Sequence, residues 1–265
     1  MIPKNGNTSG KKRWLLLPFF VLGFFLANIW SACAVVNSDF EKANEYYHAK
    51  DYQHAIQLYK RILETGVESP ALYFNLGNCY FKSDSIARAI LYYEKAKKLA
   101  PSDEDIQFNL KIAGQRVTDR IEAPSSLFFT AWWENIKMSK TIDQWGWLCV
   151  SCILLTFMSF ATFWVFSAST IKKYGFWGGL FFLLLTIFTF TLAEIRYSES
   201  VSSSEAIIMV DAISVKSSPE EKGKEIFILH SGCKLQVINT NGQWSEIRLA
   251  NNNVGWVPTS SIEFI

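Results

Sequence analysis

Two long runs without a charged residue constrain this chain more than any other feature of its sequence. They cover Trp145–Phe166 and Tyr174–Ala193. Each is close to the length of about 20 residues that an α-helix needs to cross the hydrocarbon core of a bilayer. The segment between them is short and polar and contains Lys172 and Lys173. We therefore expect transmembrane helices over residues 145–166 and 174–194.

The first residues of the chain follow the pattern of a secretory leader. A basic segment, residues 11–13, precedes an uncharged run over residues 14–36. We expect a signal peptide or an N-terminal anchor over residues 1–34. Three outcomes stay open: cleavage at Ala32-Cys33-Ala34, lipid attachment at Cys33, or retention of the whole run as an anchor. Each of them places residue 40 onwards outside the cytoplasm.

The charges beside the two uncharged runs bear on orientation. The positive-inside rule places the loop with Lys172 and Lys173 in the cytoplasm. Lys137 and Lys140 lie at the opposite end of the first run and favour the reverse orientation, so the loop charges alone are nearly balanced. The leader decides between the two orientations, because it places residue 40 onwards outside the cytoplasm. We expect a multi-pass protein of a bacterial inner membrane, with both soluble parts facing the periplasm.

The region after the leader repeats with a period of 34 residues. In the second copy, eight positions fit the spacing of the tetratricopeptide repeat: Tyr73, Leu76, Gly77, Tyr80, Ala89, Tyr93, Ala96 and Pro101. Such a repeat is a pair of antiparallel helices, which approach closely where a small residue lies at their crossing. The chain resembles this family over residues 38–120, with repeats expected at 39–68 and 70–103 and a capping helix at 104–120.

The resemblance implies an adaptor that holds a peptide or a helix in a groove. Phe40, Phe74 and Phe108 are 34 residues apart, and so are Asn44 and Asn78. By the resemblance, these five residues are the candidate partner-binding groove. The alternative is that the aromatic residues are core, which is the commoner role of aromatic side chains at helical spacing.

Between the repeats and the first uncharged run, residues 125–143 combine aromatic and charged side chains. Phe129, Trp132 and Trp133 lie at helical spacing beside Lys137 and Lys140. This pattern predicts an interfacial helix on the outer leaflet. A helix packed on the repeats is the equally open alternative.

The C-terminal residues 203–265 alternate as short strands around the turn Asn241-Gly242. Gly242-Gln-Trp244, Gly255-Trp256-Val-Pro258 and the closing Ile262–Ile265 resemble the bacterial SH3 domain. The resemblance implies a small SH3-like β-barrel that binds peptides or cell-wall glycopeptide. Trp244 and Trp256 are the candidate aromatic binding surface, with a partly core position as the alternative.

The sequence gives no indication of an enzyme. The net charge of +2 gives no general case for nucleic acid. The three histidines and five cysteines are scattered and form no metal-binding or catalytic motif. We therefore expect a non-enzymatic, multidomain α + β protein, with helical repeats, two transmembrane helices and a small barrel. We expect no catalytic residue, metal or cofactor.

The order of leader, repeats, two spans and SH3 domain resembles the BatE-type family of the Bacteroides aerotolerance operon. That resemblance implies a membrane scaffold in oxidative or envelope stress. Its partners would be von Willebrand A-domain membrane proteins and a MoxR-type ATPase. The alternative function is a peptidoglycan-binding anchor that works through the SH3 domain.

Overall fold

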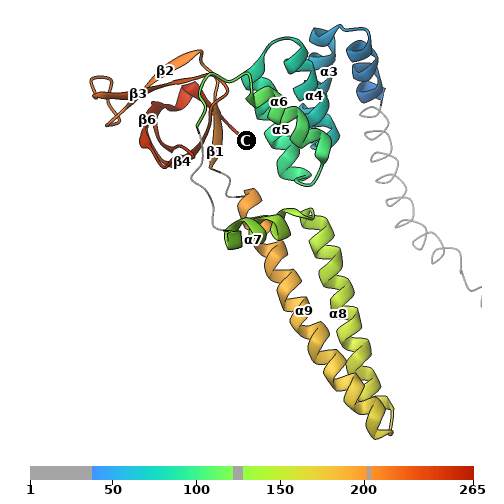
Figure 1. Cartoon of the computed structure of the whole chain (residues 1–265). Helices are drawn as coiled ribbons and strands as arrows, with labels where there is room; N and C mark the ends of the chain where they lie inside the picture. Colours follow the sequence, from blue (N-terminus) through green and yellow to red (C-terminus); the bar gives the residue numbers. More distant parts are fainter. Residues whose placement is uncertain (1–37, 122–127, 202–203) are drawn as a thin grey trace, which may run out of the picture. The chain divides into compact units, whose positions relative to one another are not determined.

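The computed structural model describes residues 38–121, 128–201 and 204–265 (Figure 1). The predicted leader at 1–34 lies outside the described residues, as does the start of the predicted interfacial helix. The chain divides into two compact units, the first ending at Val67 and the second running from Glu68 to Ile265.

The described part of the first unit, from residue 38, contains two helices, over residues 38–48 and at α3 (Tyr52–Glu64). Lys50 lies between them with a φ of +62°. The N–H of Asp51 bonds the carbonyl of Tyr46 and the N–H of Lys50 bonds that of Tyr47, at 2.9 and 3.0 Å. This is the hydrogen-bond pattern of a Schellman motif, which ends a helix by turning the chain back. Asp51 then caps α3, because its carboxylate accepts from the N–H of His54.

The second unit opens with α4 (Pro70–Lys82), α5 (Ile86–Leu99) and α6 (Glu104–Gly114). Ser69 caps α4, whose first residue is proline, and Asp103 caps α6. Asp84, with a φ of +60°, ends α4 with the same two backbone hydrogen bonds as Lys50, 34 residues earlier. The local geometry of the helix ends therefore repeats with the sequence period. The largest fully buried side chains of these helices are Leu72, Leu76, Leu91, Tyr93 and Ile106.

Three further helices follow: α7 (Phe128–Met138), α8 (Ile142–Val165) and α9 (Ser169–Val201). A capping box of Thr141 and Gln144 starts α8. Within the described residues, α8 and α9 are long and apolar enough to cross a membrane, by length and composition alone. They pack side by side (Figure 1). A Cβ atom on Gly175 would lie 2.4 Å from Oγ1 of Thr162, so the absence of a side chain there permits the close approach.

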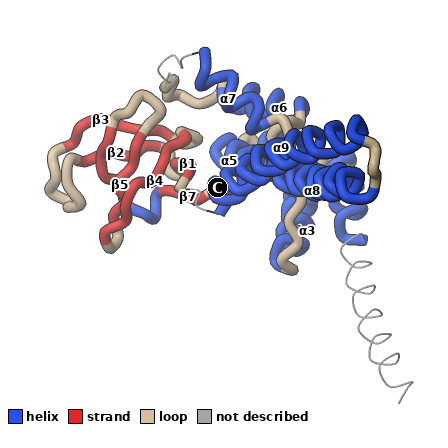
Figure 2. Tube along the Cα trace, turned by 90° about the horizontal axis from the view of Figure 1, so that it is seen from below, coloured by secondary structure: helices blue, strands red, loops and turns tan. Residues whose placement is uncertain are grey.

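Seven strands form the C-terminal part, all paired antiparallel (Figure 2). They are β1 (Glu205–Ile208), β2 (Ala212–Lys216), β3 (Glu225–His230), β4 (Lys234–Asn241), β5 (Trp244–Arg248), β6 (Val254–Pro258) and β7 (Ile262–Phe264). A short 3-10 turn, η1 (Thr259–Ser261), precedes β7. Gly242 has a φ of +61°, as the β4–β5 hairpin turn requires.

The strand order is β3-β2-β6-β5-β4-β1-β7, which makes one open sheet with β3 and β7 at its edges. Its core contains Ile208, Val215, Leu235, Ile247 and Val257. The sequence predicts a closed SH3-like barrel, but among the described strands no ladder joins β3 to β7. The structure thus establishes a C-terminal antiparallel sheet. A closed barrel stays a prediction.

Candidate functional site

Tyr93 on α5 is the packing centre of the second repeat. Its ring lies against Gly77, where an added Cβ would come within 2.6 Å, and its centroid is 5.9 Å from that of Phe74. Its hydroxyl donates to Oδ1 of Asn78 at 2.7 Å. Nδ2 of Asn109 on α6 donates to the same oxygen at 2.8 Å. Asn78 therefore ties α4 to both following helices.

The first unit contains the same arrangement. The hydroxyl of Tyr59 donates to Oδ1 of Asn44 at 2.6 Å. The rings of Phe40 and Tyr59 meet edge to face, with centroids 5.7 Å apart. In each repeat, then, the predicted groove phenylalanine and asparagine both contact a tyrosine of the same repeat. The sequence carried a signal for this bond, because each tyrosine follows its asparagine by 15 residues.

Phe108 differs from Phe40 and Phe74, which are both half-buried. It lies on α6 with 63% of its surface exposed, although it is a large apolar residue. An exposed aromatic ring on a helical repeat is available to a partner without unpacking the core. Of the predicted groove residues, Phe108 is therefore the one that the structure leaves most open.

Trp244 and Trp256 share the outer face of the sheet. Trp244 lies opposite Pro258 and Trp256 opposite Glu246 in the β5–β6 ladder, and the alternate residues Ser245 and Val257 are buried. Opposed residues of an antiparallel pair point to the same side. Both indoles are half-buried, so they are neither core nor fully exposed.

A pocket of about 680 Å³ adjoins this face, lined by Trp244, Pro258, Ile213 and Lys216 among others. Nζ of Lys216 lies 5.4 Å from the centroid of the Trp244 ring, within the range of a cation–π contact. Trp256 is not among the residues that line this pocket. The predicted aromatic surface is thus a face with one hollow, beside Trp244.

Two side-chain contacts join the sheet to α5 and to the chain after α6: Lys234 with Glu94, and His230 with Asp119. Nζ of Lys234 lies 3.0 Å from a carboxylate oxygen of Glu94 and 2.9 Å from one of Glu205. Burial lowers the pKa of Lys234, but the two carboxylates outweigh it, so the pKa lies above its ordinary value. Nδ1 of His230 lies 2.9 Å from Asp119. These contacts fix β3 and β4 to α5 and to the chain after α6.

Two of the thiols of the second unit are buried outside α8 and α9. Cys79 and Cys233 are free and buried, and burial raises the pKa of each to about 12. A buried thiol of raised pKa is a poor nucleophile, because the thiolate is the reactive form. Within the described residues, no group of three or more histidine, cysteine or acidic side chains is placed to hold a metal.

The paired, capped helices with a glycine at their crossing define a helical-repeat protein. Residues 70–103, which include α4 and α5, match the family model of the tetratricopeptide repeat. No curated protein matches the chain. The chain thus contains a tetratricopeptide repeat, which indicates a protein–protein interaction role.

Proposed function

We propose that this chain is a membrane-anchored, non-enzymatic adaptor of the bacterial envelope. The observation that carries the proposal is the tetratricopeptide match at residues 70–103 in a chain that also holds two apolar helices of membrane-spanning length. A repeat module recruits protein partners, and the helices hold it at the bilayer.

The membrane arrangement follows from charge and exposure. The sequence predicts a loop at Lys172 and Lys173, but both residues lie in the first turns of α9. This end of the helix pair lies in the cytoplasm, and the repeats and the sheet lie in the periplasm. The outward-facing surface of α8 and α9 consists of large apolar side chains, such as Leu154, Phe157 and Phe181. Such a surface is stable only when lipid or another apolar surface covers it. On α7, Phe128 is 86% exposed and Phe129 is 69% exposed, as suits a helix lying at the membrane interface.

The partner surface of the second unit includes Phe74, Asn78 and Phe108. Phe40 and Asn44 occupy the matching positions of the first repeat and are proposed as the partner-binding residues of the first unit. The order of modules supports a BatE-type scaffold with an SH3-like C-terminal barrel. Its partners would be von Willebrand A-domain membrane proteins and a MoxR-type ATPase system, in oxidative or envelope stress.

A second candidate function is a peptidoglycan-binding anchor. The observation that favours it is the shared outer face of Trp244 and Trp256, with a pocket beside Trp244. Aromatic faces of this kind stack on sugar rings as well as on peptides.

Crosslinking in intact cells separates the two functions. An adaptor should yield discrete protein adducts after solubilisation of the membrane, whether or not peptidoglycan is digested first. A wall anchor should be recovered with the peptidoglycan sacculus and released by its digestion. Recovery only with the sacculus, and with no protein adduct, would reject the adaptor.

A further inference from the structure

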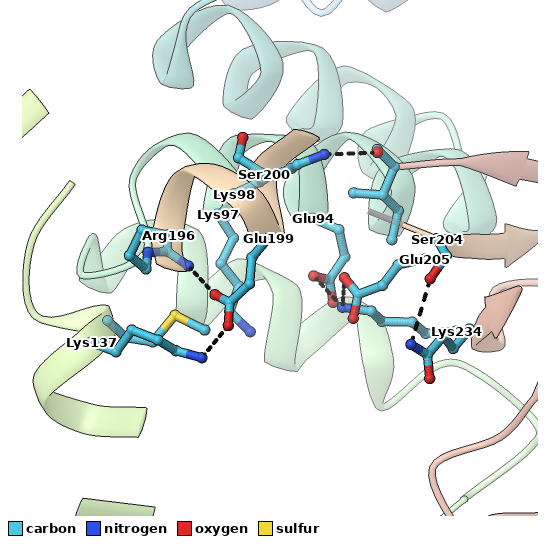
Figure 3. Close-up of a pocket in the computed structure, with 13 residues that line it drawn as sticks. Glu94, Lys97, Lys98, Lys137, Arg196, Glu199, Ser200, Ser204, Glu205 and Lys234 are labelled. Carbon is cyan, nitrogen blue, oxygen red and sulfur yellow. Dashed lines mark hydrogen bonds and ion pairs between the residues drawn. The ribbon is translucent and has the colours of Figure 1, made fainter. Parts of the chain in front are cut away.

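A cleft of about 360 Å³ lies within the second unit, where α5, α7 and α9 meet β1 and β4 (Figure 3). Its lining is rich in cations: Lys97, Lys98, Lys137, Arg196 and Lys234. Three carboxylates share the lining: Glu94, Glu199 and Glu205. Five positive against three negative side chains leave an excess of two positive charges.

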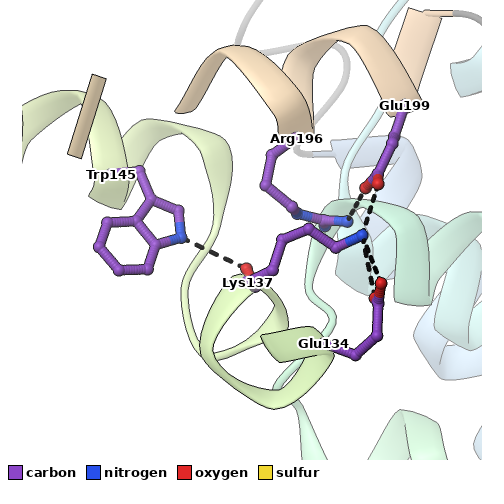
Figure 4. A network of polar contacts seen from close by, with 5 residues as sticks. All are labelled: Glu134, Lys137, Trp145, Arg196 and Glu199. Carbon is purple, nitrogen blue, oxygen red and sulfur yellow. Dashed lines mark hydrogen bonds and ion pairs between the residues drawn. The ribbon is translucent and has the colours of Figure 1, made fainter. Parts of the chain in front are cut away.

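The carboxylates of the cleft are already occupied. Lys234 pairs with both Glu94 and Glu205. Nζ of Lys137 lies 2.5 Å from Glu199 and 2.9 Å from Glu134 (Figure 4). Burial lowers the pKa of Lys137, but its hydrogen bonds to these two carboxylates outweigh the burial and raise the pKa above its ordinary value. Lys98 donates to the main-chain oxygen of Ile265 at 3.3 Å.

Two cations keep unused hydrogen-bonding capacity. Arg196 is only 6% exposed, its Nη1 reaches Glu199 at 3.5 Å, and its Nε has no hydrogen-bond partner among the described residues. A buried donor without a partner is unfavourable, so this atom is a candidate contact for a bound anion. Lys97 lines the same cleft and makes no ion pair with the described residues.

The cleft lies at one end of the apolar helix pair. Arg196 and Glu199 belong to the last turns of α9, and Nε1 of Trp145, near the start of α8, donates to the carbonyl of Lys137 at 3.4 Å (Figure 4). Tryptophans and cations at the ends of spanning helices lie at the level of the lipid headgroups. Lys172 and Lys173, in the first turns of α9, lie at the other end of the pair.

We propose that this cleft binds the phosphate group of an anionic phospholipid headgroup, held by Arg196 and Lys97. A guanidinium offers a planar fork of donors that matches phosphate oxygens, and the neighbouring lysine adds a point charge. This site rests on the proposed membrane anchoring, since only an anchored chain presents the cleft to headgroups. It would make anionic lipid a structural partner of the junction between α5, α7, α9 and the sheet.

The test is a lipid titration of the purified full-length chain in neutral detergent, followed by native mass spectrometry. The probes are phosphatidylglycerol, phosphatidylcholine and inorganic phosphate. The wild type should bind phosphatidylglycerol more tightly than phosphatidylcholine. Each of the variants Lys97→Gln and Arg196→Gln should weaken phosphatidylglycerol binding by about fivefold, as expected for the loss of about 1 kcal/mol per cation. Lys97→Gln keeps the test decisive if Arg196→Gln fails to fold.

The matched control is Lys172→Gln with Lys173→Gln, which removes two exposed cations at the other end of the helix pair. It should leave phosphatidylglycerol binding unchanged. Equal losses from the control and from Lys97→Gln would show only general charge attraction and overturn the site. Inorganic phosphate that binds as tightly as phosphatidylglycerol would overturn the lipid assignment. Alkaline carbonate extraction of the membranes is run first, and release of the chain by carbonate would refute the membrane anchoring. If the chain is retained but Lys97→Gln and Arg196→Gln bind phosphatidylglycerol as tightly as the wild type, the lipid site alone is refuted.

Discussion

A Cβ atom on Gly77 would lie 2.6 Å from Cδ1 of the Tyr93 ring, closer than a real Cβ contact comes. The ring cannot yield easily, because its hydroxyl is bonded to Asn78 and its edge lies against Phe74. The crossing of α4 and α5 is therefore built around the missing side chain of Gly77.

The first prediction is that Gly77→Ala destabilises the repeat by about 1–3 kcal/mol, the usual cost of overpacking. Native-state hydrogen exchange of residues 70–99 in the full-length chain should show faster opening by the corresponding factor. Gly114→Ala is the matched control, since an added Cβ there meets nothing within 4 Å. Equal exchange rates in Gly77→Ala and the wild type would show that the helices do not cross here.

Lys50 provides a second prediction. Its φ of +62° is a left-handed conformation, which costs about 1–2 kcal/mol for a residue with a side chain. Lys50→Gly should remove this cost. The greater chain entropy of glycine in the unfolded state offsets part of the gain, so the first unit should be stabilised by about 0.5–1 kcal/mol. Slower hydrogen exchange over residues 38–64 would record the gain. Lys60→Gly, within α3 and exposed, should instead destabilise the unit.

The two buried thiols give a pH dependence. Burial raises the pKa of Cys79 and Cys233 to about 12, whereas an unfolded thiol titrates near about 8.5. Between these values the folded chain binds more protons than the unfolded chain, so stability falls as the pH rises. Denaturant unfolding at rising alkaline pH should show this loss. In Cys79→Ala the free energy of unfolding should fall less steeply with pH than in the wild type. Rapid reaction of both thiols with a disulfide reagent in the native chain would contradict their burial.

Membrane orientation is tested with reporter fusions. Alkaline phosphatase fused after Gly114 or at the C-terminus should be active, because both points lie on the proposed periplasmic side. Fusion after Thr170, beside Lys172 and Lys173, should be inactive. The reverse pattern of activities would invert the proposed orientation and place the repeats in the cytoplasm.

Sequence reasoning was strongest where a feature is periodic. The 34-residue spacing around Gly77 predicts a tetratricopeptide repeat, which the family match confirms, and the two uncharged runs predict the long apolar helices that the structure contains. In the repeat, burial recurs at a fixed interval along the chain. In the uncharged runs, length and composition alone predict the helix.

The contacts that define the candidate sites could not be predicted in the same way. Lys137 and Glu199 are 62 residues apart and meet only because α7 packs against the end of α9. The sequence makes Asn78 a candidate groove residue, and the structure shows that its Oδ1 also accepts a hydrogen bond from the Tyr93 hydroxyl. Whether the sheet closes depends on β3 and β7, which are distant in sequence and carry no register signal that fixes their pairing.

The most direct test of the adaptor proposal is photo-crosslinking in native membranes, with p-benzoylphenylalanine in place of Phe108. p-Benzoylphenylalanine in place of Trp256 tests the sheet surface. p-Benzoylphenylalanine in place of the exposed Ile228 measures background crosslinking. We expect a discrete protein adduct from position 108 that is absent at position 228 and weaker or absent at position 256. No adduct from position 108 in a folded chain, together with peptidoglycan retention that Trp256→Ala abolishes, would contradict the adaptor and establish the wall anchor.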